Sequence, residues 1–71
     1  MHKSPRFFGI HVGMTASEVY DKWEELGLIE KHYGEKQYFW WDITDYGKSL
    51  GGRKSSQGTP TFDYDDIKDL F

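Results

Sequence analysis

The segment TASEVYDKWEELG, residues 15–27, constrains the fold more than any other part of the chain. Thr15 and Glu18 have the spacing of a capping box, in which each side chain binds a backbone N–H group at a helix start. Apolar side chains recur at helical spacing and form one stripe: Ala16, Val19, Tyr20, Trp23 and Leu26. Gly27 is the residue type that ends a helix in the left-handed conformation. The segment therefore predicts an amphipathic helix over about residues 15–26.

The residues after this helix predict a β-hairpin with Gly34 in its turn. In the second strand, alternation places Phe39, Trp41 and Ile43 on one face and Tyr38 and Trp40 on the other. Because Ile43 directly precedes the next predicted helix, its face is predicted to turn inward. Phe39 and Trp41 are then expected to fill the core behind the helix, and Tyr38 and Trp40 to point outward.

Shorter elements are predicted on both sides of this unit. The apolar run Phe7, Phe8, Ile10 and Val12 predicts a short strand, and residues 1–6 carry no pattern and are expected to fray. Thr44 is the predicted N-cap of a helix from Asp45 to about Leu50. Residues 53–60 predict a polar loop and residues 61–64 a brief strand. A last helical turn, capped by Asp65, is predicted to dock Ile67, Leu70 and Phe71.

Length and composition limit the size of the core, the possible cross-links and metal sites, and the cellular location of the chain. With 71 residues the chain is one small domain, residues 1–71, that buries little surface. The absence of cysteine excludes disulfides and zinc–thiolate sites. No apolar run approaches the roughly 20 residues of a membrane helix, and the N-terminus lacks the apolar core of a signal peptide. We therefore expect a cytoplasmic protein without a membrane partner.

The order of the segments resembles the second half of a winged-helix domain. In winged-helix repressors of the bacterial multiple-antibiotic-resistance type, a recognition helix ends in a leucine- and glycine-containing turn. A two-stranded wing follows, and its return strand enters a helix that starts with threonine and has glycine three residues later. The corresponding stretches here are residues 26–29, LGLI, and residues 43–48, ITDYGK.

Residues 44–71 are also similar to a module near the C-terminus of phage antirepressor and phage regulatory proteins. That module has a Thr-x-x-Gly-Lys helix start, a Gly-rich segment, a Gly-Thr-Pro loop, an aromatic strand and a short final helix. The matching residues are Thr44, Gly47, Lys48, Gly51, Gly58, Thr59, Pro60, Tyr64, Ile67 and Leu70. The resemblance covers about residues 14–71. It implies an α+β fold, a reduced winged-helix-like domain of helix, hairpin wing, short helix and C-terminal strand and helix.

Two departures separate the chain from a DNA-reading winged helix. Only fourteen residues precede the helix in the recognition position, where a complete winged helix has two further helices. That helix also carries four acids, Glu18, Asp21, Glu24 and Glu25, against one lysine, and the net charge of the chain is -3. Carboxylates repel phosphates instead of releasing their counterions. The charge therefore argues against DNA reading by this helix.

The favoured hypothesis is a small phage-type regulatory or inhibitory protein that acts by binding another protein. Antirepressors and anti-defence inhibitors, including anti-CRISPR proteins, act in this way, in the cytoplasm of the host cell. The predicted binding residues are Glu18, Asp21, Glu24, Glu25, Tyr38 and Trp40. A negative surface suits a partner that is basic or normally binds nucleic acid, and Trp and Tyr are frequent interface anchors. A homodimer that completes the core is left open.

The alternative hypothesis is a DNA-binding winged-helix transcriptional regulator. It would use the wing and a basic loop with Lys48, Arg53 and Lys54, whose side chains can contact phosphates. No nucleophile motif surrounds any serine, and the histidines lack metal-ligand spacing. The sequence therefore predicts no enzyme, no metal site and no cofactor.

Overall fold

The computed structural model describes the backbone of residues 1–71 and every side chain except that of Gln37. The central predicted helix is present as α2, Ala16–Glu25. Both hydrogen bonds of the capping box form: the Glu18 N–H donates to the Thr15 hydroxyl over 3.1 Å, and the Thr15 N–H donates to the Glu18 carboxylate over 2.9 Å. Gly27 ends the helix with a φ of 78°. The prediction of this helix is confirmed, because its signals are all local.

A second helix, α1 (Pro5–Val12), lies where the sequence predicted a short strand, and that prediction was wrong. Pro5 occupies the first turn, where its fixed φ suits a helix, and Gly13 ends the helix with a φ of 74°. Phe8 and Val12 are four residues apart and turn toward the core, whereas Phe7 and Ile10 are exposed. The same apolar run therefore fits a helical face as well as an alternating strand.

The first residues form regular structure, where the sequence predicted that residues 1–6 fray. β1 (His2–Lys3) pairs antiparallel with β5 (Pro60–Asp63). The His2 Nε2 atom lies 2.6 Å from the carbonyl oxygen of Gly51, and Pro5 is buried. The contact between His2 and Gly51 holds this end of the chain across about fifty residues of sequence, and no local sequence pattern predicts it.

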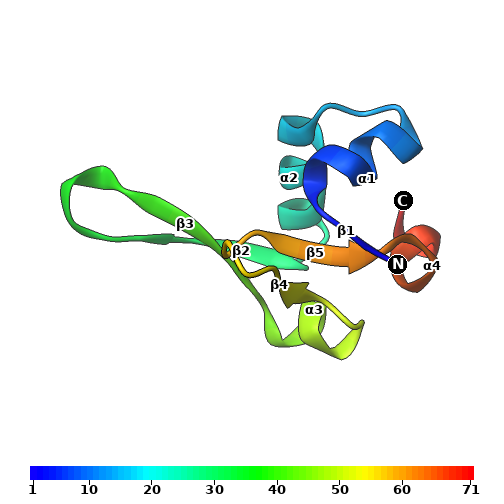
Figure 1. Ribbon diagram of the computed structural model, residues 1–71. Helices are drawn as coiled ribbons and strands as arrows, with labels where there is room; N and C mark the ends of the chain where they lie inside the picture. Colours follow the sequence, from blue (N-terminus) through cyan, green and yellow to red (C-terminus); the bar gives the residue numbers. More distant parts are fainter.

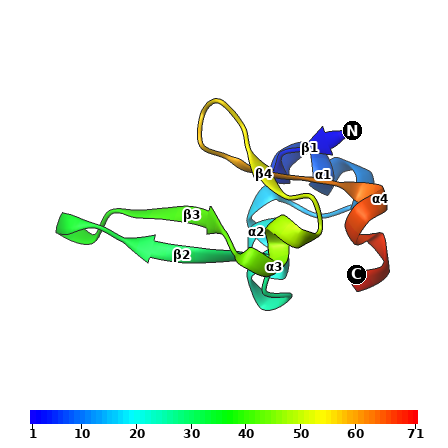
Figure 2. The ribbon, with the colours of Figure 1, turned by 90° about the horizontal axis from the view of Figure 1, so that it is seen from below.

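The predicted hairpin is confirmed and is the longest projection of the molecule. β2 (Ile29–Tyr33) pairs antiparallel with β3 (Phe39–Ile43), with Ile29 opposite Ile43 and Tyr33 opposite Phe39. The 3₁₀ turn η1 (Glu35–Gln37) connects the strands directly after Gly34. Two perpendicular views show that the distal half of the hairpin extends away from all other elements (Figures 1 and 2).

The C-terminal part follows the predicted order with two corrections. Thr44 caps α3 (Asp45–Ser49), and α4 (Tyr64–Ile67) with the 3₁₀ turn η2 (Lys68–Leu70) closes the chain. The cap of α4 is Asp63 and not Asp65, because the Asp63 carboxylate accepts the Asp65 N–H over 3.1 Å. The predicted polar loop begins with a strand, β4 (Arg53–Lys54), and the sheet order is β1-β5-β4.

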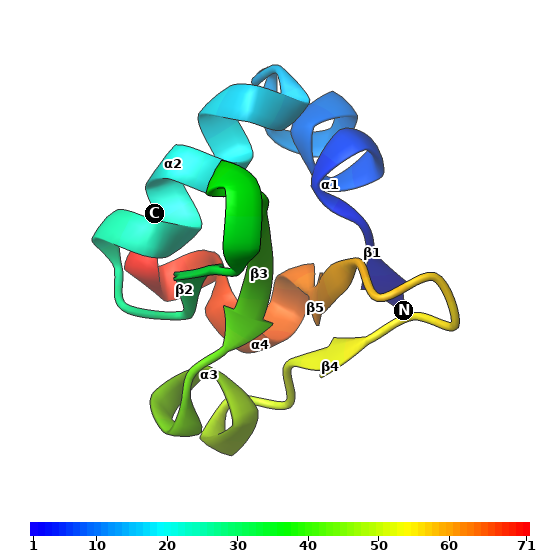
Figure 3. The same ribbon diagram turned by 90° about the vertical axis from the view of Figure 1, so that its left-hand side faces the viewer.

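The core lies between the helix pair and strand β5. In Figures 1 and 3, α1 and α2 lie on one side of β5 and α3 lies on the other. Trp23 of α2 is at the centre, edge-on to Phe8 at 5.1 Å and to Phe62 at 4.9 Å between ring centroids. The buried apolar residues are Phe8, Val19, Trp23, Leu28, Ile29, Ile43, Phe62 and Ile67. Aromatic edges therefore supply much of the packing in this small domain.

Phe39 does not fill the core, and this part of the hairpin prediction was wrong. The alternation itself is correct, because Ile43 is buried and Trp41 is half-buried on the same face. Phe39, two residues further from the body, is 50% exposed. The hairpin is longer than the surface that covers it, so a face with core-like residues continues into solvent.

Candidate functional site

Burial decreases steadily along one face of the hairpin. At its root, Ile29 and Ile43 are buried, and at the next cross-strand pair Trp41 is half-buried. At the distal pair, Tyr33 is 70% exposed and its ring lies 6.4 Å from that of Phe39. Exposed aromatic side chains that continue a buried face are typical of binding surfaces.

An open groove of about 510 Å³ separates this face from the N-terminal half of α2. Its walls are formed by Ala16, Ser17, Tyr20 and Asp21 of the helix and by Lys31, Phe39 and Trp41 of the hairpin. Tyr20 stacks on Trp41, so the two walls of the groove are in contact at this pair, and burial raises the pKa of the Tyr20 phenol. The groove thus combines apolar walls with one carboxylate and one ammonium group.

Lys31 lies over two aromatic rings of the groove. Its Nζ atom is 5.0 Å from the centroid of Phe39 and 5.1 Å from the centroid of Trp41, within the range of cation–π attraction. The two rings are almost perpendicular, at 89°, with centroids 6.1 Å apart. We call this pair of rings the aromatic corner. Sequence analysis missed Lys31, although the hairpin register places it directly opposite Trp41.

The four predicted acids of α2 are exposed and lie along one side of the helix, and Asp21 is the one that lines the groove. Asp21 lines the groove, and Glu24 follows it at helical spacing, three residues later. Glu18 and Glu25 lie three residues before and four residues after Asp21, so they neighbour it on the same side of the helix without lining the groove. Glu18 is also engaged in the capping box, where the hydrogen bond from the Thr15 N–H lowers the pKa of its carboxyl.

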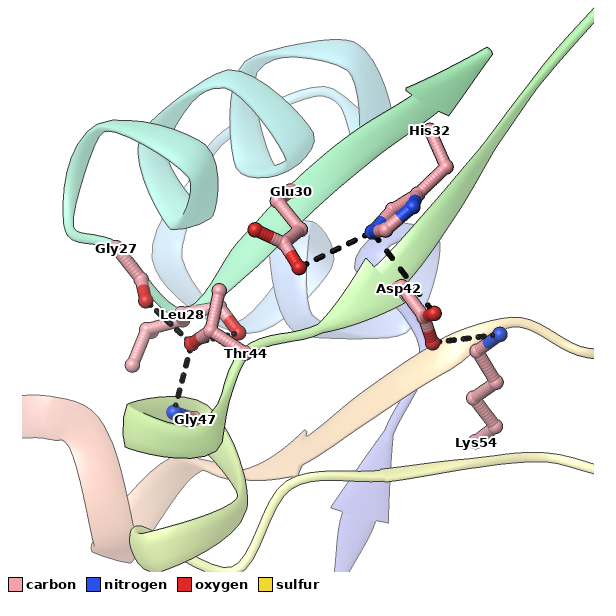
Figure 4. Close-up of polar contacts among 8 residues, drawn as sticks. All are labelled: Gly27, Leu28, Glu30, His32, Asp42, Thr44, Gly47 and Lys54. Atoms are coloured by element: carbon pink, nitrogen blue, oxygen red, sulfur yellow. Dashed lines mark hydrogen bonds and ion pairs between the residues drawn. The ribbon is translucent and has the colours of Figure 1, made fainter. Parts of the chain in front are cut away.

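The outward aromatic residues lie apart from Asp21. Trp40 is 47% exposed on the opposite face of the hairpin, stacked on His32 with ring centroids 5.8 Å apart. The His32 Nε2 atom lies 3.0 Å from Glu30 and 3.9 Å from Asp42, as Figure 4 shows. Tyr38, directly before β3, is 75% exposed. Among the described side chains, Phe39 and Trp41 are therefore the hairpin aromatics that share the groove with Asp21.

One of the three predicted basic residues, Lys54, is paired with an acid within the protein. The Lys54 ammonium lies 2.9 Å from the Asp42 carboxylate (Figure 4), and this contact lowers the pKa of Asp42. Arg53 lies 3.3 Å from the His2 ring, and Lys48 is exposed in the last turn of α3. Lys54 therefore offers less positive charge to a phosphate backbone than the sequence indicates.

Thr44 fixes the root of the hairpin relative to both neighbouring helices. Its hydroxyl donates to the Gly27 carbonyl at the end of α2 over 2.6 Å, and accepts the Gly47 N–H of α3 over 2.9 Å (Figure 4). Gly47 lacks a side chain where a Cβ atom would overlap the Leu28 carbonyl. This close packing holds the hairpin in the direction that opens the groove.

Metal ligation and membrane crossing have no candidate in the part of the chain that the structure describes. No group of three or more His, Cys, Asp or Glu residues there is arranged to hold a metal ion. None of its helices combines the length and the apolar content that crossing a membrane would take.

The chain was also compared with known proteins. Comparisons with models of protein families, with curated proteins and with solved structures give no match.

Proposed function

We propose that this chain is a small regulatory protein of winged-helix-like type that acts by binding a basic protein. Phage antirepressors and anti-defence inhibitors such as anti-CRISPR proteins are the functional classes that the resemblance of residues 14–71 favours. The observation that carries the proposal is the hairpin face that leaves the core at Trp41 and continues as the exposed rings of Phe39 and Tyr33, beside the Asp21 carboxylate.

The order of the elements supports the winged-helix-like part of the proposal. α1 and α2 are consecutive helices joined by a short turn, and the hairpin follows α2 directly, as a wing follows a recognition helix. α1 supplies one helix before the recognition position that the sequence analysis did not find. Gly9 of α1 allows this tight arrangement, because a Cβ atom there would overlap the Met14 carbonyl.

The charges support a protein partner in place of DNA. A recognition helix that reads DNA lies in the major groove, between the phosphate backbones. Here the helix in that position carries four acids, with Asp21 beside the hairpin, and Lys54 near the hairpin root is paired with Asp42. A carboxylate next to phosphates is repelled, whereas a carboxylate next to aromatic rings can bind a basic side chain and set specificity.

Site-specific photo-crosslinking in the cells that encode the chain tests the proposal. A benzophenone side chain at position 39 would lie on the exposed hairpin face. The same group at position 46, on α3, is the matched control, because Tyr46 is equally exposed, at 49%. We expect a protein adduct from position 39, weakened when Asp21 is replaced by asparagine, and none from position 46. Adducts to nucleic acid from position 39, or equal adducts from both positions, would contradict it.

A further inference from the structure

We propose that the aromatic corner of Phe39 and Trp41 is the seat for an arginine side chain of the basic partner, with Asp21 as its counter-ion. The inference rests on the proposed function and specifies the chemistry of its contact.

The protein itself shows that the corner accepts a cation. The Lys31 Nζ atom lies about equally far from both ring centroids, 5.0 Å and 5.1 Å, and the rings meet at 89°. Two ring faces thus act on one positive charge. Rings in this arrangement recognise cations through the negative potential above each face.

Lys31 is an occupant that a partner can displace. Its side chain is exposed, and no carboxylate among the described residues lies within ion-pair distance of its Nζ atom. A lysine ammonium is strongly hydrated and its stem is flexible, so it can move into water at little cost. Lys31 then occupies the aromatic corner in the free protein and is displaced by a cation that binds the two rings more tightly.

Arginine is the better cation for this position. Its planar guanidinium is weakly hydrated, stacks on aromatic faces and can bind a carboxylate with two parallel hydrogen bonds. Asp21 lines the same groove as both rings, from the opposite wall. The volume of about 510 Å³ exceeds that of one side chain, so residues flanking the arginine also fit.

This arrangement gives Lys31 a role that charge alone does not predict. If Lys31 competes for the corner, its removal strengthens arginine binding by more than the loss of one positive charge would. Lys22 of α2 does not line the groove and provides the matched control, because Lys22→Met makes the same change in net charge. A partner that bound through Lys31 directly would show the opposite sign.

The test is a titration of the full chain with a capped tetra-arginine peptide, followed by NMR of the tryptophan indole N–H signals at low ionic strength. We expect the Trp41 signal to shift, and Phe39→Leu to weaken binding by about threefold to tenfold. Phe39→Tyr, which keeps a ring, and Tyr38→Leu should leave affinity unchanged. Asp21→Asn should weaken binding more than Glu25→Gln, and Lys31→Met should strengthen it more than Lys22→Met. The peptide with citrulline in place of arginine should not bind.

Three outcomes would overturn the inference. If Phe39→Leu has no effect and Asp21→Asn equals Glu25→Gln, the acidic surface attracts cations diffusely, and the proposed function stands without the seat. If no peptide binds, the seat is excluded, and crosslinking from position 39 decides the proposed function separately. If a tetra-glutamate peptide binds and Lys31→Met abolishes this, both proposals are wrong.

Discussion

The ring of Tyr20 stacks on that of Trp41, with centroids 5.2 Å apart and ring planes 18° apart. Tyr20 belongs to the apolar stripe of α2, and Trp41 is the hairpin residue at which burial begins to give way to exposure. The stack therefore joins the helix to the hairpin where the two walls of the groove are in contact. The orientation of the distal hairpin, and with it the aromatic corner, depends on this pair.

A double-mutant cycle should measure this contact. Tyr20→Leu and Trp41→Leu keep apolar volume on both sides but remove the stacked rings. Aromatic pairs contribute about 0.5–1.5 kcal/mol beyond their area burial, so we expect a coupling free energy of this size. Urea unfolding of the wild type, both single variants and the double variant gives the value. Effects that add to within about 0.3 kcal/mol would show that the rings do not interact.

Two phenylalanines should respond very differently to truncation. Phe62 is fully buried against Trp23, so Phe62→Ala should reduce the free energy of unfolding by about 3–5 kcal/mol. Phe39 is half exposed, and Phe39→Ala should cost less than about 1 kcal/mol. Thermal denaturation followed by circular dichroism compares the two. A large loss at Phe39 would make the distal hairpin a structural element instead of a binding surface.

Removing the Thr44 hydroxyl should destabilise the root of the hairpin. Thr44→Val keeps the shape but loses the cap of α3 and the hydrogen bond to the Gly27 carbonyl. We expect a loss of about 1–2 kcal/mol in the free energy of unfolding, because N-caps contribute on that order. Thr44→Ser retains the hydroxyl and is the control. Equal stability of the valine and serine variants in urea would contradict the role of Thr44.

The stability of the protein should fall in acid, partly through Asp42. The hydrogen bond from Lys54 lowers the pKa of Asp42 in the folded state below its ordinary value of 3.8. The stabilisation is therefore present above the unfolded-state pKa and is lost as the pH falls through the folded-state pKa. Asp42→Asn and Lys54→Met should each reduce the decline of the urea midpoint below about pH 4. Acid profiles parallel to that of the wild type would show that this pair does not contribute.

Local signals account for what the sequence predicted correctly. The capping box of Thr15 and Glu18 and the stop at Gly27 lie within one segment, and α2 has the predicted bounds. The alternation of residues 39–43 and the cap at Thr44 are equally local, and both elements form. Each of these signals acts on the backbone within a few residues, so no knowledge of the rest of the chain is required.

The failures concern relationships between distant segments. Phe7 to Val12 fits both a helical and a strand period; Pro5 and Gly13 favour the helix locally, and packing of Phe8 against Trp23 stabilises it. β1 has two residues and depends on a partner strand near the other end of the chain. The position of Phe39 depends on how far α2 reaches along the hairpin. Alternation gives the face of a residue but not the extent of the surface that covers it.

The most direct test of the central claim is fluorescence anisotropy of a labelled random DNA duplex titrated with the purified protein at low ionic strength. The four acids of α2 and the Lys54–Asp42 pair predict no binding at micromolar protein. Binding that weakens steeply between about 50 and about 200 mM salt, and that is abolished by charge reversal at Arg53 and Lys54, would contradict the account. It would instead make the chain a DNA-binding winged helix.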